Sequence, residues 1–208
     1  DPEVTDGNDM YSLEGAVYLV YSSYSGGTPV SGMRNTYTGG RLSGYIGSIT
    51  TDARGEGTIT GLKIGTYYLI EDQAPVNYES SIYVYEVETT TTNAEVQTRI
   101  DVVDEPGVEP DVMAFHKTWD GDNTDTIHYP AGTQFTVTYY DGYYDTESQL
   151  PSTYTRQWVF EAKVSRGNDC GFQMTEDYLV EDLSDELYVI DGITVLPIGT
   201  YKIQETKA

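Results

Sequence analysis

The feature that most constrains this chain is an internal repeat. The segment that starts at Gly65 reads Gly-Thr-Tyr-Tyr-Leu-Ile-Glu-Asp-Gln-Ala-Pro, and the one that starts at Gly199 reads Gly-Thr-Tyr-Lys-Ile-Gln-Glu-Thr-Lys-Ala. A weaker match joins Gly-Ala-Val-Tyr-Leu-Val, from Gly15, to Gly-Thr-Gln-Phe-Thr-Val, from Gly132. Such self-similarity indicates one structural module used twice. Because 208 residues suffice for two domains of ordinary size, we expect two tandem modules of one fold.

Both halves of the chain carry short runs of strand-forming residues between turn residues. The 20 Tyr and 21 Gly, together with many Thr and Val, favour strands and tight turns. Strands are predicted at 12–21, 44–50, 57–62, 65–71, 81–89 and 94–103, and then at 111–119, 132–140, 154–164, 171–174, 187–190 and 199–205. Short strands at this spacing are typical of an all-β sandwich.

The boundary between the modules is predicted at residues 105–110, which read Glu-Pro-Gly-Val-Glu-Pro. The two prolines fix φ and remove backbone donors that a sheet would need. We therefore expect a first module at residues 1–105, a linker at 106–110 and a second module at 111–208.

The charge balance excludes several classes of partner. The chain has 34 acidic and 11 basic residues, for a net charge of -23 at pH 7. Nucleic acids and anionic membrane surfaces are bound through clustered Lys and Arg, which this sequence lacks. No run approaches the about 18 apolar residues of a membrane-spanning helix. We therefore expect neither nucleic acid binding nor membrane insertion.

Residues with ligand or nucleophile chemistry are scarce. The single cysteine, Cys170, cannot form an internal disulfide, and the only histidines are His116 and His128. This set supports neither a zinc site nor a Ser-His-Asp triad, so we expect no cofactor and no turnover enzyme. One acidic loop carries oxygen ligands of the kind that calcium prefers, Asp120, Asp122 and Asp125. An acidic turn between strands is the favoured interpretation of that loop.

The repeated segment, the Leu-Glu-Gly-Ala-Val-Tyr run from Leu13 and Tyr78 shortly after Ala74 and Pro75 resemble the Cna B-type (SpaA-like) domains of Gram-positive adhesins and pilins. The resemblance covers both halves and implies two transthyretin-like β-sandwich modules. It also implies an extracellular protein, at the bacterial surface or attached to the cell wall, with neighbouring modules or pilus subunits as partners. Domains of this kind are often closed by a spontaneous isopeptide bond from Lys to Asn or Asp, which a buried Glu promotes.

Such a bond needs its three groups in a dry core. Desolvation lowers the pKa of a lysine amine and raises the pKa of a carboxyl group, so the amine becomes a neutral nucleophile. A protonated Glu then polarises the acceptor carbonyl and carries protons as water or ammonia leaves. The reaction would be at most a single autocatalytic turnover.

The resemblance assigns these roles to particular positions. In the second half, Lys117 matches the nucleophile and Glu205 the promoter. In the first half, Glu71 matches the promoter, and Asp104 is favoured over Asp101 as the acceptor.

Each module then lacks one reactant. Lys117 lies 15 residues before Gly132, and the same distance before Gly15 falls outside the chain. Asp104 lies 33 residues after Glu71, and the matching acceptor would fall beyond the last residue. We therefore expect the first module to lack its first strand and the second its last. Three explanations stay open: a piece of a longer protein, a module that has lost its bond, or strands supplied by a neighbouring chain at an open sheet edge.

The predicted function is a structural stalk or pilus-shaft segment, stabilised by isopeptide bonds. The alternative is an adhesive module that binds a host glycan or matrix protein through a tyrosine-rich surface. The residues proposed for that surface are Tyr139, Tyr140, Tyr143 and Tyr144.

Overall fold

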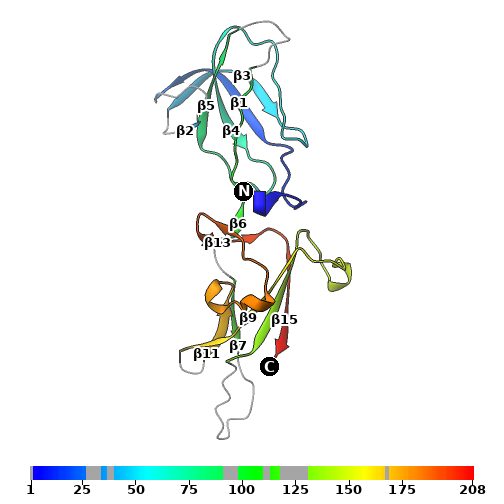
Figure 1. The fold of residues 1–208 in the computed structure, drawn as a ribbon. Helices are drawn as coiled ribbons and strands as arrows, with labels where there is room; N and C mark the ends of the chain where they lie inside the picture. Colours follow the sequence, from blue (N-terminus) through cyan, green and yellow to red (C-terminus); the bar gives the residue numbers. More distant parts are fainter. Residues whose placement is uncertain are drawn as a thin grey trace. The chain divides into compact units, whose positions relative to one another are not determined.

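The computed structural model describes residues 2–26, 34–36, 40–90, 98–109, 113–117, 131–166 and 169–208. These residues form antiparallel strands with a few single helical turns, which confirms the all-β expectation. The chain divides into two compact units (Figure 1). The first unit is Tyr11–Gly107, and the second unit combines Asp1–Met10 with Val108–Ala208.

The first unit is built on one five-stranded sheet with the order β2-β5-β4-β1-β3. Its strands are β1 (Val17–Ser25), β2 (Arg34–Thr36), β3 (Arg41–Thr50), β4 (Gly65–Gln73) and β5 (Tyr83–Thr89). All neighbouring strands in this sheet are antiparallel. Residues 57–62, predicted as a strand, have no strand pairing, although Ile59 and Leu62 pack against the core.

The core of the first unit lies on one face of this sheet. Successive side chains of a strand point to opposite faces, so every second residue of β1 and β4 enters the core. Its buried members are Ala16, Tyr18, Val20, Tyr67, Leu69 and Tyr85. Glu71 takes the next inward position of β4 after Tyr67 and Leu69, and is buried as they are.

Residues 98–105 alternate like a strand but have no ladder partner among the described residues. Ile100, Val102 and Asp104 are partly buried, and the residues between them are exposed. Backbone pairing starts only where Glu79 N donates to Glu105 O at 2.8 Å. This segment therefore packs by its side chains, while its backbone is unpaired with any strand in the described parts of the chain.

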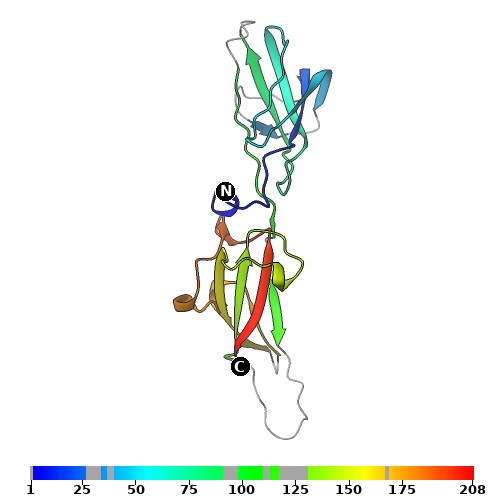
Figure 2. The ribbon, with the colours of Figure 1, turned by 90° about the vertical axis from the view of Figure 1, so that its right-hand side faces the viewer.

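The second unit contains two three-stranded sheets that face each other. One sheet has the order β15-β8-β9, and its strands are seen side by side in Figure 2, with β15 in red. The other has the order β10-β11-β7. Their strands are β7 (Ala114–Lys117), β8 (Gln134–Tyr140), β9 (Arg156–Glu161), β10 (Lys163–Arg166), β11 (Asp169–Gln173) and β15 (Thr200–Lys207).

Aromatic rings join the two sheets of the second unit. The ring of Phe172 on β11 lies 5.1 Å from that of Phe135 on β8 and 5.4 Å from that of Phe160 on β9. Such contacts between facing strands are typical of a sandwich core. Short elements complete the unit: α1 (Pro2–Thr5), β6 (Val108–Glu109), η1 (Glu147–Gln149), η2 (Glu176–Tyr178), η3 (Glu181–Leu183), β12 (Val189–Ile190), β13 (Ile193–Thr194) and β14 (Leu196–Pro197).

The boundary between the units differs from the expected division at two places. Residues 2–10, expected in the first module, pack with the second unit. Within the expected linker, Pro106 bridges to Tyr78 in the first unit, and β6 pairs with β14 in the second. Residues 2–10 were assigned to the first module because they adjoin it in the sequence, whereas their tertiary contacts place them in the second unit.

None of the helices in the described parts of the chain is long and apolar enough to cross a membrane.

Candidate functional site

Glu71 is the centre of a polar cluster inside the first unit. It lies opposite Tyr18 in the register of β4 with β1, and only 8% of it is exposed. The Tyr18 hydroxyl donates to Glu71 Oε1 at 3.0 Å, and the backbone N–H of Ser81 donates to Oε2 at 2.5 Å. Both carboxylate oxygens therefore have donors, as burial of a charged group requires.

Asp104 shares the Tyr18 hydroxyl with Glu71. That hydroxyl lies 3.3 Å from Asp104 Oδ2 and 3.5 Å from Oδ1. Because a hydroxyl carries one hydrogen, it can donate to only one of the two carboxyl groups at a time. Among the described residues, no ion pair reaches either carboxyl group.

This environment changes the titration of the cluster. Burial, reinforced by the charge of Glu71, raises the pKa of Asp104 to about 6. Burial also raises the pKa of Tyr18, and the neighbouring Asp104 and Glu71 charges add to that shift. Tyr18 thus stays a neutral donor, and Asp104 holds a proton at mildly acidic pH.

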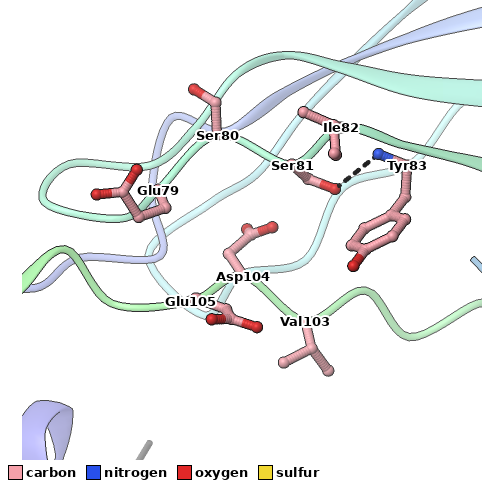
Figure 3. A pocket seen from close by; sticks show the side chains of 8 residues that line it. All are labelled: Glu79, Ser80, Ser81, Ile82, Tyr83, Val103, Asp104 and Glu105. Carbon is pink, nitrogen blue, oxygen red and sulfur yellow. Dashed lines mark hydrogen bonds between the residues drawn. The ribbon is translucent and has the colours of Figure 1, made fainter. Parts of the chain in front are cut away.

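A pocket of about 280 Å³ opens beside Asp104. Figure 3 shows that residues 79–83 form one wall and residues 103–105 the other, with the Asp104 carboxyl group directed between them. Val103 points to the opposite side in that view. The pocket gives an incoming side chain access to Asp104, which the buried Glu71 lacks.

The two candidate acceptors are in different environments. Asp101 is exposed and accepts a 2.9 Å hydrogen bond from Arg99 Nε. Asp104, three residues later, meets Tyr18 next to Glu71. The structure therefore brings Asp104, and not Asp101, to the Glu71 cluster.

Lys117 and Glu205 meet in the second unit. Lys117 Nζ lies 2.5 Å from Glu205 Oε2, and each side chain is about one-third exposed, at 32% and 34%. The two residues come from different sheets, on β7 and β15. Lys117 is two residues after Phe115, whose ring stacks on Phe172, so it shares the inward face of β7.

The two units use the repeat in the same register. Tyr18 of β1 faces Glu71 of β4, and Phe135 of β8 faces Glu205 of β15. Phe135 has no hydroxyl that could bind Glu205. Instead, Lys117 Nζ forms the ion pair with Glu205 and lies 5.9 Å from the centre of the Phe135 ring. The same backbone arrangement therefore carries a tyrosine bridge in one unit and an ion pair in the other.

Sequence reasoning missed Tyr18 and Ser81 as parts of the cluster. Tyr18 could have been found, because it alternates with the apolar Ala16 and Val20 in the first predicted strand of the chain. Ser81 contributes a backbone N–H, for which its side chain gives no signal.

The four tyrosines proposed as a ligand surface are not exposed together. Tyr139 is fully buried and Tyr140 nearly so, because β8 is the central strand of its sheet and is covered on both faces there. Tyr144 is partly buried, with its ring 6.2 Å from that of Tyr140. Of the four, Tyr143 alone is well exposed, at 76%.

The calcium candidates Asp120, Asp122 and Asp125 lie outside the described residues. Within the described part of the chain, no group of three or more His, Cys, Asp or Glu is placed to hold a metal ion. Cys170 is buried, and burial raises the pKa of its thiol.

Comparison with protein families gives one match that bears on this arrangement. A family model described as the SpaA prealbumin-like fold domain matches residues 4–103. This range contains Tyr18 and Glu71 and ends next to Asp104. A comparison with curated proteins returned no match.

Proposed function

Because residues 4–103 match the family model of the SpaA prealbumin-like fold domain, we propose that this chain is a stalk or pilus-shaft segment of a Gram-positive surface protein. Domains of this family are structural, are typically extracellular and form pilus polymers with neighbouring subunits. The observation that carries the proposal is the cluster of buried Tyr18, buried Glu71 and partly buried Asp104, since it brings two carboxyl groups together next to the core of the first unit.

We infer that the second unit is a second module of the same type. Its support is the matched register of the two repeats. Glu71 faces Tyr18 in the first unit, and Glu205 faces Phe135 in the second. The facing sheets of the second unit also fit a prealbumin-like sandwich.

We propose that each unit is closed by an isopeptide bond. In the first unit a lysine amine attacks Cγ of Asp104, the N–C bond forms, a C–O bond breaks, and one water leaves. The Asp104 pKa of about 6 keeps roughly a tenth of this group protonated at pH 7, in the form that loses water most readily. Glu71, held next to Tyr18, accepts and returns the amine proton.

In the second unit, Lys117 is the nucleophile and Glu205 the promoter. Their direct contact is the geometry in which the carboxylate can take the ammonium proton. An Asn or Asp that reaches this pair would complete the bond, with loss of ammonia or water respectively.

The lysine for the first unit would arrive on an extended segment. The backbone of 98–104 pairs with no strand that the structure describes, and the pocket beside Asp104 is accessible. An added strand would satisfy that edge and place its side chains alternately into the pocket. Such a strand can come from the same polypeptide or from a neighbouring subunit, and the second case would staple subunits into a fibre.

Intact mass under denaturing conditions tests the bonds. Protein from its native source should be lighter than its formula by one water for a bond to Asp104, and by one water or ammonia for a bond to Lys117. Glu71→Ala should restore the mass in the first unit only, and Lys117→Ala in the second only. A denaturant-resistant ladder on a reducing gel would show bonds between subunits.

The full formula mass together with a single gel band would contradict the isopeptide proposal. The sandwich would then be held without covalent closure, and the case for an adhesive module would strengthen.

The adhesive alternative now depends on Tyr143, which is the exposed member of the proposed surface. Tyr143→Ala should abolish binding to a glycan array or to immobilised matrix proteins if the module is adhesive. A stalk segment should show no saturable binding in either form.

A further inference from the structure

The second unit is assembled from two separate stretches of chain. Residues 2–10 belong to it, the chain then leaves at Met10 to build the whole first unit, and it returns at Val108. The first unit is therefore an insertion in the chain of the second. A chain pulled from residues 1 and 208 is held by the second unit at both ends.

The segment 2–10, here called the strap, is fixed by two buried side chains. Val4 is 3% exposed and Asn8 is 6% exposed. Asn8 Nδ2 donates to the Tyr139 hydroxyl at 2.9 Å, and lies 3.4 Å from the carbonyl oxygens of Val4 and Ile198. The N–H of Met10 donates to Asn8 Oδ1 at 3.0 Å, so both ends of the Asn8 amide are used.

The partner of Asn8 is firmly held. Tyr139 is fully buried on β8, its hydroxyl donates to Ile198 O at 3.0 Å, and its ring lies 4.9 Å from that of Tyr201 on β15. Its ring also contacts those of Trp158 and Tyr188. A force on the strap is therefore passed directly to β8.

From β8 the force reaches the end of the chain through one ladder. Tyr139 pairs with Tyr201 near the start of β15, and the opposite end of the ladder is Gln134 with Lys207. Tension between Tyr139 and the end of β15 pulls the strands along their length. Because interstrand hydrogen bonds lie across the strands, such tension loads them together and does not open them one by one.

We propose that the strap sets the path of tension through this chain. While the strap is docked, tension between residues 1 and 208 passes through Asn8, Tyr139, β8 and β15, and the first unit carries none of it. When the strap detaches, the first unit comes into the line of force. The strap thus acts as a gate that protects the first unit until a threshold force is reached.

The first unit is the part that gains from this protection. Its segment 98–104 has no ladder among the described residues, and its carboxyl pair has no described ion-pair partner. The proposal rests on the tensile role argued above, but it needs only the chain connectivity and the strap contacts. It applies to a chain in which Asp104 carries no isopeptide bond, because such a bond would give the first unit a covalent force path of its own.

Single-molecule pulling on the full chain, with handles at its two ends, tests the gate. The wild-type chain should show a short extension as the strap detaches. Only afterwards should it show the long extension from unfolding of residues 11–107, roughly 330 Å at about 3.4 Å per residue. Asn8→Ala should detach the strap about tenfold faster at a fixed force, as expected for the loss of a buried hydrogen-bonding group.

Two controls keep the result specific. Asp9→Asn changes an exposed neighbour in the same segment and should leave the strap event unchanged. With handles moved to residues 11 and 107, the first unit is loaded directly, and it should unfold at the same force in the wild type and in Asn8→Ala. Val4→Ala is a second strap variant, which removes apolar packing and keeps the Asn8 contacts.

The proposal is overturned if the first unit of the wild type extends before or without the short event. It is also overturned if both strap variants release at the wild-type rate. Intact mass measured on the same sample reports the isopeptide bonds separately, so that failure of either proposal is recognised by itself.

Discussion

Tyr18 links the carboxyl groups of Glu71 and Asp104 in the first unit, because its single hydroxyl lies within hydrogen-bonding distance of both. Glu71 has a second donor in the backbone of Ser81, whereas Asp104 is the member next to the open pocket. Asp104 is therefore the group whose protonation can change with little rearrangement. In the second unit, Phe135 removes this bridge, and Lys117 supplies the polar contact to the promoter.

The pKa of Asp104 makes the stability of the first unit depend on pH. Folding raises this pKa from 3.8 to about 6, so the folded state binds more protons than the unfolded state between these values. Stability from this group is therefore present below about pH 4 and is lost as the pH rises through 6. Because solvent screens a half-buried group, we expect a loss of about 1–2 kcal/mol.

Urea unfolding of the 208-residue chain between pH 4 and 7 measures this effect. Asp104→Asn, which cannot titrate, should remove this contribution to the pH slope, and the exposed Asp101→Asn should keep it. An unchanged slope in Asp104→Asn would mean that the carboxyl group does not titrate as the cluster geometry requires.

At the scale of elements, residues 98–105 show that strand-like alternation and strand pairing are separate properties. Ile100 and Val102 pack on the core, but the segment has no ladder there. The alternation is set by the side chains of the segment itself, whereas a ladder needs a partner strand at the right distance. The predicted strand at 94–103 therefore matches the packing of its described residues but not their pairing.

Hydrogen exchange should distinguish these two properties. Amides of 99–104 should exchange rapidly because their N–H groups have no ladder partner among the residues that the structure places, whereas amides of β4, paired on both sides, should be protected. Mass spectrometry of peptides covering the two segments provides the comparison within one sample. Equal protection would show that the edge is already paired, and would remove the support for strand addition.

At the scale of the whole molecule, the order of residues in the chain differs from their grouping in space. The first ten residues and Val108–Ala208 form one unit, and the residues between them form the other. A change near the start of the chain should therefore affect the unit at its end.

Val4→Ala tests this coupling. Removing two buried methyl groups should destabilise the second unit by about 1–2 kcal/mol and leave the first unit unchanged. Trp158 is buried in the second unit, so its fluorescence during urea unfolding reports that unit. A wild-type midpoint in Val4→Ala would mean that the strap contributes nothing to that unit.

The sequence by itself determined the all-β class and most strand positions, because alternation and turn residues are local signals. It also showed that the segments starting at Gly65 and Gly199 repeat each other. It also pointed to Glu71 and Asp104, which lie on the inward faces of their segments and whose roles in a bond stay predictions. Only the tertiary structure placed residues 2–10 with the second unit and brought Tyr18 between the carboxyl groups. The burial of Tyr139 was also visible only in the tertiary structure, because residues far away in the chain cover its side chain.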